Sequence, residues 1–158
     1  MIKATFVHVS VVAEDWKRLV AFYCDVFGCE VVPPTRDLSG PKLEAGIGVP
    51  GARIRGVHLR LPGWGETGPT LEVFQYDSPG ERGRSSPRGA APDINAPGWA
   101  HLAFRVEDVA KAHDAVLRHG GSAVGEIVSM DVEGAGRVTF AYMRDPEGNV
   151  VELQSWRE

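Results

Sequence analysis

The feature that most constrains the fold of this chain is an internal repeat. The segment His8–Gly28, HVSVVAEDWKRLVAFYCDVFG, aligns without a gap with His101–Gly121, HLAFRVEDVAKAHDAVLRHGG. Histidine meets histidine at the start, an acidic pair meets an acidic pair, and glycine meets glycine at the end. Because internal self-similarity marks a repeated supersecondary unit, we expect the chain to fold as two related modules.

Each copy begins with an alternating apolar segment that is typical of a half-buried strand. In the first copy Val7, Val9 and Val11 point to one face, so His8 points to the other. The same alternation separates His101 from the aliphatic residues beside it. Helical apolar periodicity follows each strand, after acidic residues of the kind that stabilise a helix N-terminus. We therefore expect each strand to turn its aliphatic face to its own helix and its histidine to the opposite face.

Three further strands are predicted after each helix, so that each half reads β-α-β-β-β. The expected strands are 30–32, 53–61 and 70–76 in the first half and 122–127, 137–143 and 150–156 in the second. A strong turn signal, DPEGN, immediately precedes the last of them. The predicted fold class is α+β, built from two βαβββ modules.

The predicted modules are residues 1–76 and 98–158, which together make one domain, and residues 77–97 are expected to form a linker or flap between them. This connection contains four Pro, three Gly and three Ser, a composition that favours irregular structure. Residues 33–50 are also expected to be irregular.

Composition and charge argue against several classes of function. A net charge of −4 without a run of Lys and Arg argues against a nucleic-acid partner. The first residues lack the long apolar run of a signal peptide or a membrane helix. Cys24 and Cys29 have a spacing that fits neither a redox pair nor a zinc knuckle. They are expected to be free thiols in a cytoplasmic protein without a membrane partner.

The last predicted strand of each half places one glutamate between aliphatic residues, Glu72 in LEV and Glu152 in VEL. Taken singly, a strand histidine is more often a hydrogen-bonded core residue, and a strand glutamate more often lies at a solvated edge. Two His/Glu pairs at matching positions instead predict one divalent cation, because an unpaired buried carboxylate is costly. The predicted ligands are His8, Glu72, His101 and Glu152. Such a set suits Zn, Ni, Co, Mn or Fe. His58 is a weaker candidate, because it has no partner in the repeat.

The paired modules, the two aligned segments and the closing DPEGNVVEL resemble the vicinal oxygen chelate superfamily. Its members include glyoxalase I, methylmalonyl-CoA epimerase, extradiol dioxygenases and proteins of bleomycin or fosfomycin resistance. The resemblance covers nearly the whole chain and implies a curved mixed sheet around a metal-binding cleft. It also implies a homodimer, and leaves open whether a site forms within one chain or between exchanged chains.

The His-Glu-His-Glu set resembles bacterial glyoxalase I most closely, whereas the epimerase usually has glutamine at the place of Glu72. Val12 and Tyr76 stand where glyoxalase I typically has an arginine and an asparagine that hold glutathione. The resemblance therefore implies a metal-dependent lyase or isomerase that moves a proton next to a carbonyl. The small substrate would be chelated through two neighbouring oxygens, with Glu152 as the first candidate for the base and Glu72 as the second.

Three residues on the predicted open face are candidates for substrate binding: Trp99, Arg105 and Tyr142. Core packing is the alternative role for Tyr142. A non-catalytic small-molecule-binding or resistance protein and an iron-dependent ring-cleaving dioxygenase are the alternative functions. The sequence leaves open the substrate, the metal, and the use of glutathione or CoA.

Overall fold

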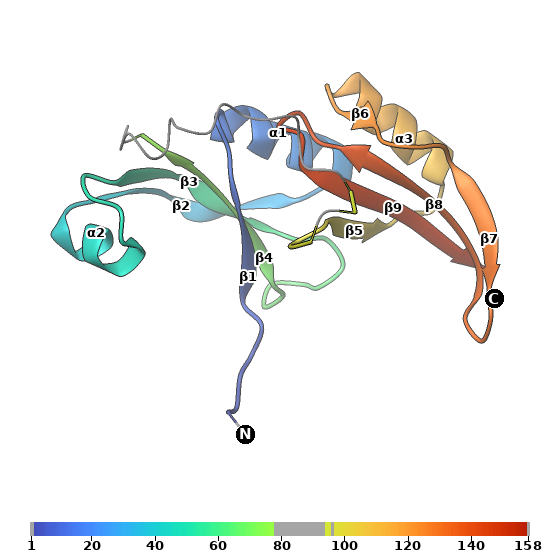
Figure 1. Cartoon of the computed structure of the whole chain (residues 1–158), viewed down its shortest axis with the longest axis horizontal. Coiled ribbons are helices and arrows are strands. Elements are labelled where there is room, and N and C mark those ends of the chain that lie inside the picture. Colours follow the sequence, from blue (N-terminus) through green and yellow to red (C-terminus); the bar gives the residue numbers. More distant parts are fainter. Residues whose placement is uncertain (1, 78–93, 96, 158) are drawn as a thin grey trace. The chain divides into compact units, whose positions relative to one another are not determined.

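The computed structural model describes residues 2–77, 94–95 and 97–157 of the 158-residue chain. The chain divides into two compact units, Met1–Arg88 and Gly89–Glu158, and each unit has its own sheet (Figure 1). Both sheets mix parallel and antiparallel strand pairs, which confirms the α+β class. The predicted linker at 77–97 lies for the most part outside the described residues.

The described residues of the first unit form four strands and two helices. In chain order these are β1 (His8–Val12), α1 (Trp16–Phe27), β2 (Glu30–Ser39), α2 (Pro41–Ile47), β3 (Arg53–Arg60) and β4 (Thr70–Tyr76). The strand order in the sheet is β1-β4-β3-β2, so the first strand lies parallel to the last.

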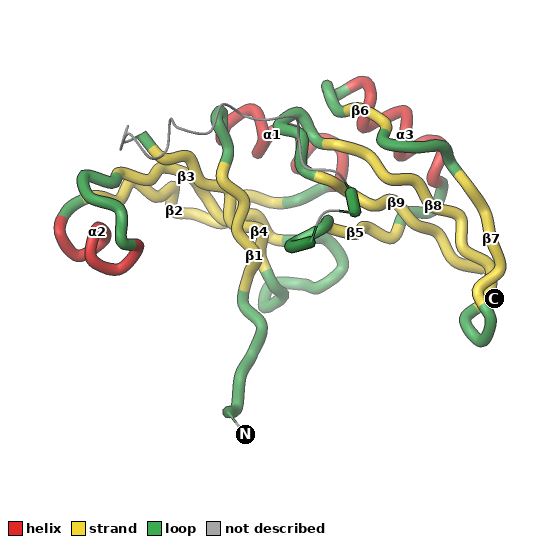
Figure 2. The backbone as a smooth tube through the Cα atoms, in the orientation of Figure 1, coloured by secondary structure: helices red, strands yellow, loops and turns green. Residues whose placement is uncertain are grey.

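The second unit repeats this order, except that a strand, β7, takes the place of α2. Its elements are β5 (Leu102–Arg105), α3 (Val109–Arg118), β6 (Ser122–Ala123), β7 (Val128–Val132), β8 (Gly136–Arg144) and β9 (Val150–Arg157). The sheet order is β5-β9-β8-β6, and β7 also pairs with β8. Figure 2 shows the strands and helices of each unit by colour.

The repeat seen in the sequence is a repeat of strand register. In the parallel pair of the first unit Ser10 lies beside Glu72, and in the second unit Ala103 lies beside Glu152. Both helices also begin in the same way, because the second acid of each aligned pair is the N-cap. Asp15 accepts a hydrogen bond from the Arg18 backbone N–H at 3.1 Å, and Asp108 accepts one from Lys111 at 3.0 Å.

Each helix packs on the aliphatic face of its own sheet. In the first unit α1 contributes the buried Leu19 and Tyr23 and contacts β4, where Leu71 and Val73 are fully buried. In the second unit α3 lies over β8 and β9 (Figure 1) and buries Val116 in the same way. Because strand residues alternate between faces, this packing leaves the faces that bear the glutamates turned away from the helices.

The aligned glycines that end the two copies have different roles. Gly28 adopts a φ of 68° as the C-cap of α1, a left-handed conformation that glycine adopts without steric cost. Gly121 has no such φ; a Cβ there would collide with the carbonyl oxygen of Arg144 and the side chain of Val116. The second glycine is therefore required by the close approach of α3 to β8.

Two predictions about the edge strands were wrong. Residues 33–50 are not irregular, since β2 continues to Ser39 and α2 follows. The register shift between Val32 and Arg36 accommodates Pro33 and Pro34, because an edge strand tolerates proline at a bulge. Of the predicted strand 122–127, only β6 is a strand, and β7 begins after that range; the two pair with different parts of β8.

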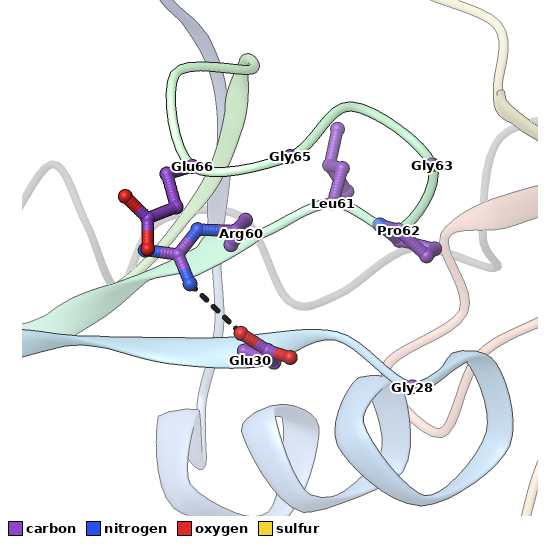
Figure 3. A pocket seen from close by; sticks show the side chains of 8 residues that line it. All are labelled: Gly28, Glu30, Arg60, Leu61, Pro62, Gly63, Gly65 and Glu66. Carbon is purple, nitrogen blue, oxygen red and sulfur yellow. Dashed lines mark hydrogen bonds and ion pairs between the residues drawn. The ribbon is translucent and has the colours of Figure 1, made fainter.

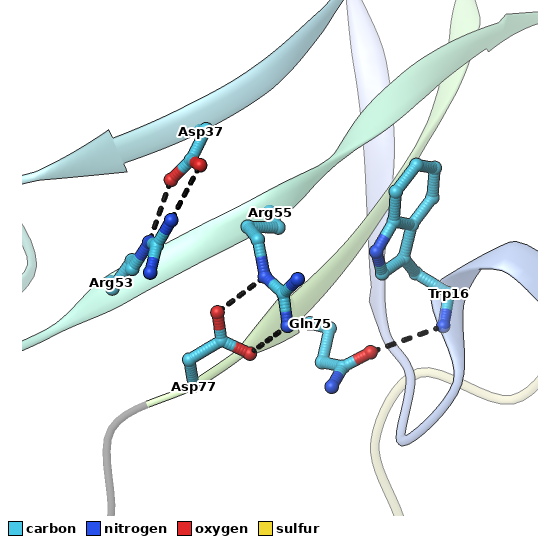
Figure 4. Close-up of polar contacts among 6 residues, drawn as sticks. All are labelled: Trp16, Asp37, Arg53, Arg55, Gln75 and Asp77. Atoms are coloured by element: carbon cyan, nitrogen blue, oxygen red, sulfur yellow. Dashed lines mark hydrogen bonds and ion pairs between the residues drawn. The ribbon is translucent and has the colours of Figure 1, made fainter.

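Polar side chains connect the elements at the end of the first sheet that is drawn in Figure 4. Arg53 donates two hydrogen bonds to Asp37, at 2.8 and 2.7 Å, and Arg55 donates to both carboxylate oxygens of Asp77. The hydrogen bond from Arg55 lowers the pKa of Asp77, so this carboxylate stays charged at neutral pH. These pairs fix β2 and the end of β4 to β3.

Both cysteines are free thiols, as the sequence predicts. Burial raises the pKa of Cys29 to about 12, so its thiol stays protonated and unreactive. Within the described ranges, no helix combines the length and the apolar character that crossing a membrane requires.

Replacing Gly56 with alanine is expected to destabilise the protein by about 1–3 kcal/mol. Gly56 lies opposite Phe74 in the β3–β4 pair, and an added Cβ would collide with the Phe74 ring and the Val73 carbonyl. Urea unfolding measures the loss. The matched control is Gly46→Ala in α2, where nothing lies within 4 Å, so the change should be neutral or slightly stabilising. Equal midpoints for the two variants would contradict this explanation.

Candidate metal centre

In the first unit the predicted histidine and glutamate lie together on the face opposite the helix. His8 opens β1 and pairs with Thr70, while Glu72 lies two residues further along β4 on the same face. The distance from His8 Nε2 to Glu72 Oε2 is 3.8 Å. The Glu72 side chain is 16% exposed, so its charge is largely removed from water and requires a partner.

A second histidine, His58, completes a cluster around Glu72. It lies directly across from Glu72 in the antiparallel β3–β4 pair, and its Nε2 is 3.1 Å from Glu72 Oε1. One ligand atom from each of His8, His58 and Glu72 lies within 4.8 Å of the others. Partial burial lowers the pKa of His58, an effect that Glu72 opposes. From the sequence His58 was the weaker candidate, because the second half has no histidine at the equivalent place.

In the second unit the predicted histidine and glutamate also lie together. His101 directly precedes β5, and its Nε2 is 3.0 Å from Glu152 Oε2. Glu152 is 16% exposed, as Glu72 is. The residue across from Glu152 is Tyr142, whose ring centroid lies 5.3 Å from that of His101. Tyr142 thus takes the place that His58 takes in the first unit, and burial together with the Glu152 charge raises its pKa.

The three candidates for substrate binding have different surroundings. Tyr142 is partly buried on the same face as Glu152, and Arg105 ends β5 on that face with an exposed side chain. Trp99 precedes β5, outside any strand, and is 99% exposed. Substrate binding by these three residues stays a prediction, as does the meeting of the two His/Glu pairs around one ion.

A hollow beside the β3–β4 loop contains none of the predicted site residues (Figure 3). Arg60 lies in its lining and donates a hydrogen bond to Glu30 at 2.8 Å, and the Glu66 side chain points toward the same guanidinium in the figure. Because this arginine already faces acidic side chains, the hollow is a poor receptor for an anionic substrate.

The three donors gathered in the first unit could hold a divalent metal ion. Ligand atoms about 2.1 Å from an ion are about 3.0–3.4 Å apart when they are neighbours in octahedral or tetrahedral geometry. The His58–Glu72 and His101–Glu152 distances of 3.1 and 3.0 Å match that spacing, and the His8–Glu72 distance of 3.8 Å is slightly longer. Atoms joined by a hydrogen bond lie at the same distances as neighbouring ligands of one ion. The case for a metal ion therefore depends on the number and chemistry of the donors on each face.

Comparison with known proteins yields one family match and several fold matches. The family model described as the Glyoxalase/Bleomycin resistance protein/Dioxygenase superfamily matches residues 5–153. The Escherichia coli (strain K12) protein named Uncharacterized protein YaeR is 27% identical over 150 residues, which is 92% of each chain.

Two solved structures illustrate the fold matches. A glyoxalase family protein from Bacillus cereus is 19% identical, with a TM-score of 0.80 over 100% of this chain and 99% of that one. Another from Enterococcus faecalis is 22% identical, with a TM-score of 0.58 over 95% of this chain and 96% of that one. At these identities the two structures inform the fold alone.

Proposed function

This chain belongs to the glyoxalase/bleomycin resistance protein/dioxygenase superfamily, and from that premise we propose that it is a metal-dependent lyase or isomerase. The proposed reaction is proton transfer next to a carbonyl of a small substrate that presents two neighbouring oxygens. One observation supports it most strongly. Each unit places one histidine and one largely buried glutamate together at the same strand register.

The proposal includes one divalent cation of the group Zn, Ni, Co, Mn or Fe. Its proposed ligands are His8, Glu72, His101 and Glu152. When bound, such a cation would polarise a substrate carbonyl and make the adjacent C–H more acidic. The two pairs would come from one chain or from two chains of a homodimer, and that homodimer is part of the proposal.

Glu152 is the carboxylate proposed to accept the substrate proton. Among the described contacts, Glu72 faces two imidazoles, those of His8 and His58, whereas Glu152 faces the single imidazole of His101. A carboxylate with fewer partners moves more easily toward a substrate carbon. There it would accept the proton from that carbon and later return it to the substrate. Arg105 on the same face of the second sheet would orient an anionic part of the substrate.

A second candidate function is oxygen-dependent iron chemistry. His8, His58 and Glu72 make a group of two histidines and one carboxylate within a single unit, and non-haem iron oxygenases use that ligand set. The third candidate, non-catalytic binding of a small molecule, requires no metal-dependent turnover.

The test is solvent-deuterium exchange at the carbon next to the carbonyl. The protein is loaded with each metal in turn and offered 2-oxoaldehyde–thiol adducts and acyl-CoA thioesters. We expect exchange with at least one substrate class, and none after the metal is removed by a chelator. Metal-dependent oxygen consumption with catechols would favour the iron enzyme. Binding without exchange or turnover across the panel would favour the third candidate.

A further inference from the structure

We propose that β7 is a contact between two copies of this chain, paired antiparallel and edge to edge about a two-fold axis at Met130. The two β7 strands would continue the second sheet of one protomer into that of its partner. The proposed function leaves the surface at which two chains meet unspecified. β7 carries none of the proposed metal ligands, so the two proposals can fail separately.

β7 lies at an open edge of its sheet (Figure 1). It pairs with β8 on one side, and no described segment pairs with its other side. In an edge strand, half of the backbone N–H and C=O groups point away from the sheet and can pair with another strand. All five residues of β7 are exposed, although three of them are apolar: Val128, Met130 and Val132. This edge therefore combines pairing groups of the backbone with exposed apolar side chains.

The repeat provides an internal comparison, because β2 occupies the corresponding outer edge in the first unit. Pro33 and Pro34 lie within β2, and its pairing with β3 is interrupted there. Proline lacks the N–H that an incoming strand would bond, and Arg36 adds a charge to the same edge. The sequence of β7, VSMDV, contains neither proline nor a basic residue. Since natural edge strands generally carry such protection, its absence from β7 indicates that another chain covers this edge.

A second copy fits this edge because the sequence of β7 is self-complementary. In the register centred on Met130, Val128 lies opposite Val132 of the partner subunit, and the two Met130 side chains meet on the axis. Side chains that are directly opposite on adjacent strands contact each other, so all three apolar residues gain an apolar neighbour. The two edges satisfy each other, and the assembly closes at two chains.

Charge favours the same register. Asp131 is the one charged residue of β7, and its carboxylate lies 3.1 Å from the Arg137 guanidinium of its own chain. In the register centred on Met130, Asp131 lies opposite Ser129 of the partner subunit. A register centred on Asp131 would instead set two acids opposite each other, which is unfavourable.

The first test measures the mass of full-length variants by sedimentation equilibrium over a concentration series. Met130→Lys is expected to halve the mass of the wild-type particle, because it sets two ammonium groups opposite each other on the axis. Val31→Lys on β2 is the matched control, since Val31 is 50% exposed and Met130 is 51% exposed, and it should keep the wild-type mass. Circular dichroism checks that both variants are folded. Neither variant removes a proposed ligand, so the bound metal per chain reports separately on the proposed function.

A disulfide tests the position of the axis. After oxidation with diamide, Met130→Cys should give linked pairs of chains on a non-reducing gel, because cysteines that are opposite on adjacent strands are within reach of a disulfide. Val31→Cys and the wild type, which keeps Cys24 and Cys29, should give far less.

A wild type that sediments as a single chain at every concentration would overturn the inference, and the edge of β7 would then be open to an extended segment of another protein. Equal masses for the wild type and Met130→Lys, or equal crosslinking of the two cysteine variants, would overturn it as well.

Discussion

Replacing Glu152 with glutamine is expected to lower the rate of metal-dependent proton exchange by about 10²–10⁴-fold, the usual contribution of a positioned general base. Glutamine has the size of glutamate and still offers an oxygen to a metal, but its amide does not accept a proton from carbon. The neighbours Val151 and Leu153 are fully buried on the opposite face of β9, so the strand should be unaffected. The exchange rate and the bound metal per chain are measured together.

Glu72→Gln is the matched control for that prediction. Glu72 lies at the same register in β4 and is equally buried, but it faces two histidines. We expect this variant to weaken metal binding and to lose less of the exchange rate once it is saturated with metal. A larger loss of the exchange rate in Glu72→Gln than in Glu152→Gln would mean that Glu72, and not Glu152, accepts the substrate proton.

Removing the metal is expected to lower the free energy of unfolding by about 4 kcal/mol when the free metal had been at about 1,000 times its Kd. For a chain of this length that corresponds to a decrease in Tm of about 8–16 °C. The physical reason is that Glu72 and Glu152 are each 16% exposed and would lose the cation that compensates their burial. Differential scanning calorimetry with and without a chelator measures the effect.

The control for metal removal is a chain in which all four proposed ligands are changed to alanine. Its Tm should be the same with and without the chelator. If the wild type also shows no shift at any metal concentration, the cation contributes nothing to the native state and the proposed site is wrong.

Features predicted from the internal repeat were more accurate than the predicted bounds of the strands. It correctly predicted that Asp15 and Asp108 lie at helix N-termini, because an acid at that position satisfies backbone N–H groups. The DPEGN turn was also predicted correctly. Asp145 is buried there because its carboxylate accepts hydrogen bonds from the backbone N–H groups of Glu147 and Asn149. Local hydrogen bonding of this kind is readable from sequence.

The edge strands were harder to predict, because their boundaries depend on pairing rather than on local preference. Pro33 and Pro34 read as breakers, yet β2 passes them through a bulge and resumes pairing at Arg36. In the second unit β7 has the alternating sequence VSMDV, but all five of its residues are exposed, so its bounds are set by pairing with β8 and not by burial in the core. Tertiary pairing overrides propensity in both cases.

The position of His58 beside Glu72 depends on the register of the β3–β4 hairpin, which the sequence of the first half does not reveal. His58 and Glu72 are opposite because Gly65 lies midway between them, in a glycine-rich loop that has no unique centre in the sequence. In the second half Tyr142 and Glu152 are centred on Glu147, within the recognisable DPEGN turn. Transferring the Tyr142–Glu152 separation to the first half would have placed Pro62 rather than His58 beside Glu72, because the loop between β3 and β4 is longer than the loop between β8 and β9.

The four-ligand site is tested by the number of divalent ions bound per chain, determined by titrating the metal-free protein calorimetrically. If His8, Glu72, His101 and Glu152 surround one ion, we expect one ion per chain, whether the site forms within a chain or across a homodimer. His8→Ala and His101→Ala should each weaken that single binding event. Two ions per chain would mean that each unit binds its own metal. That result, or the absence of any bound ion, would contradict a single site built from these four ligands.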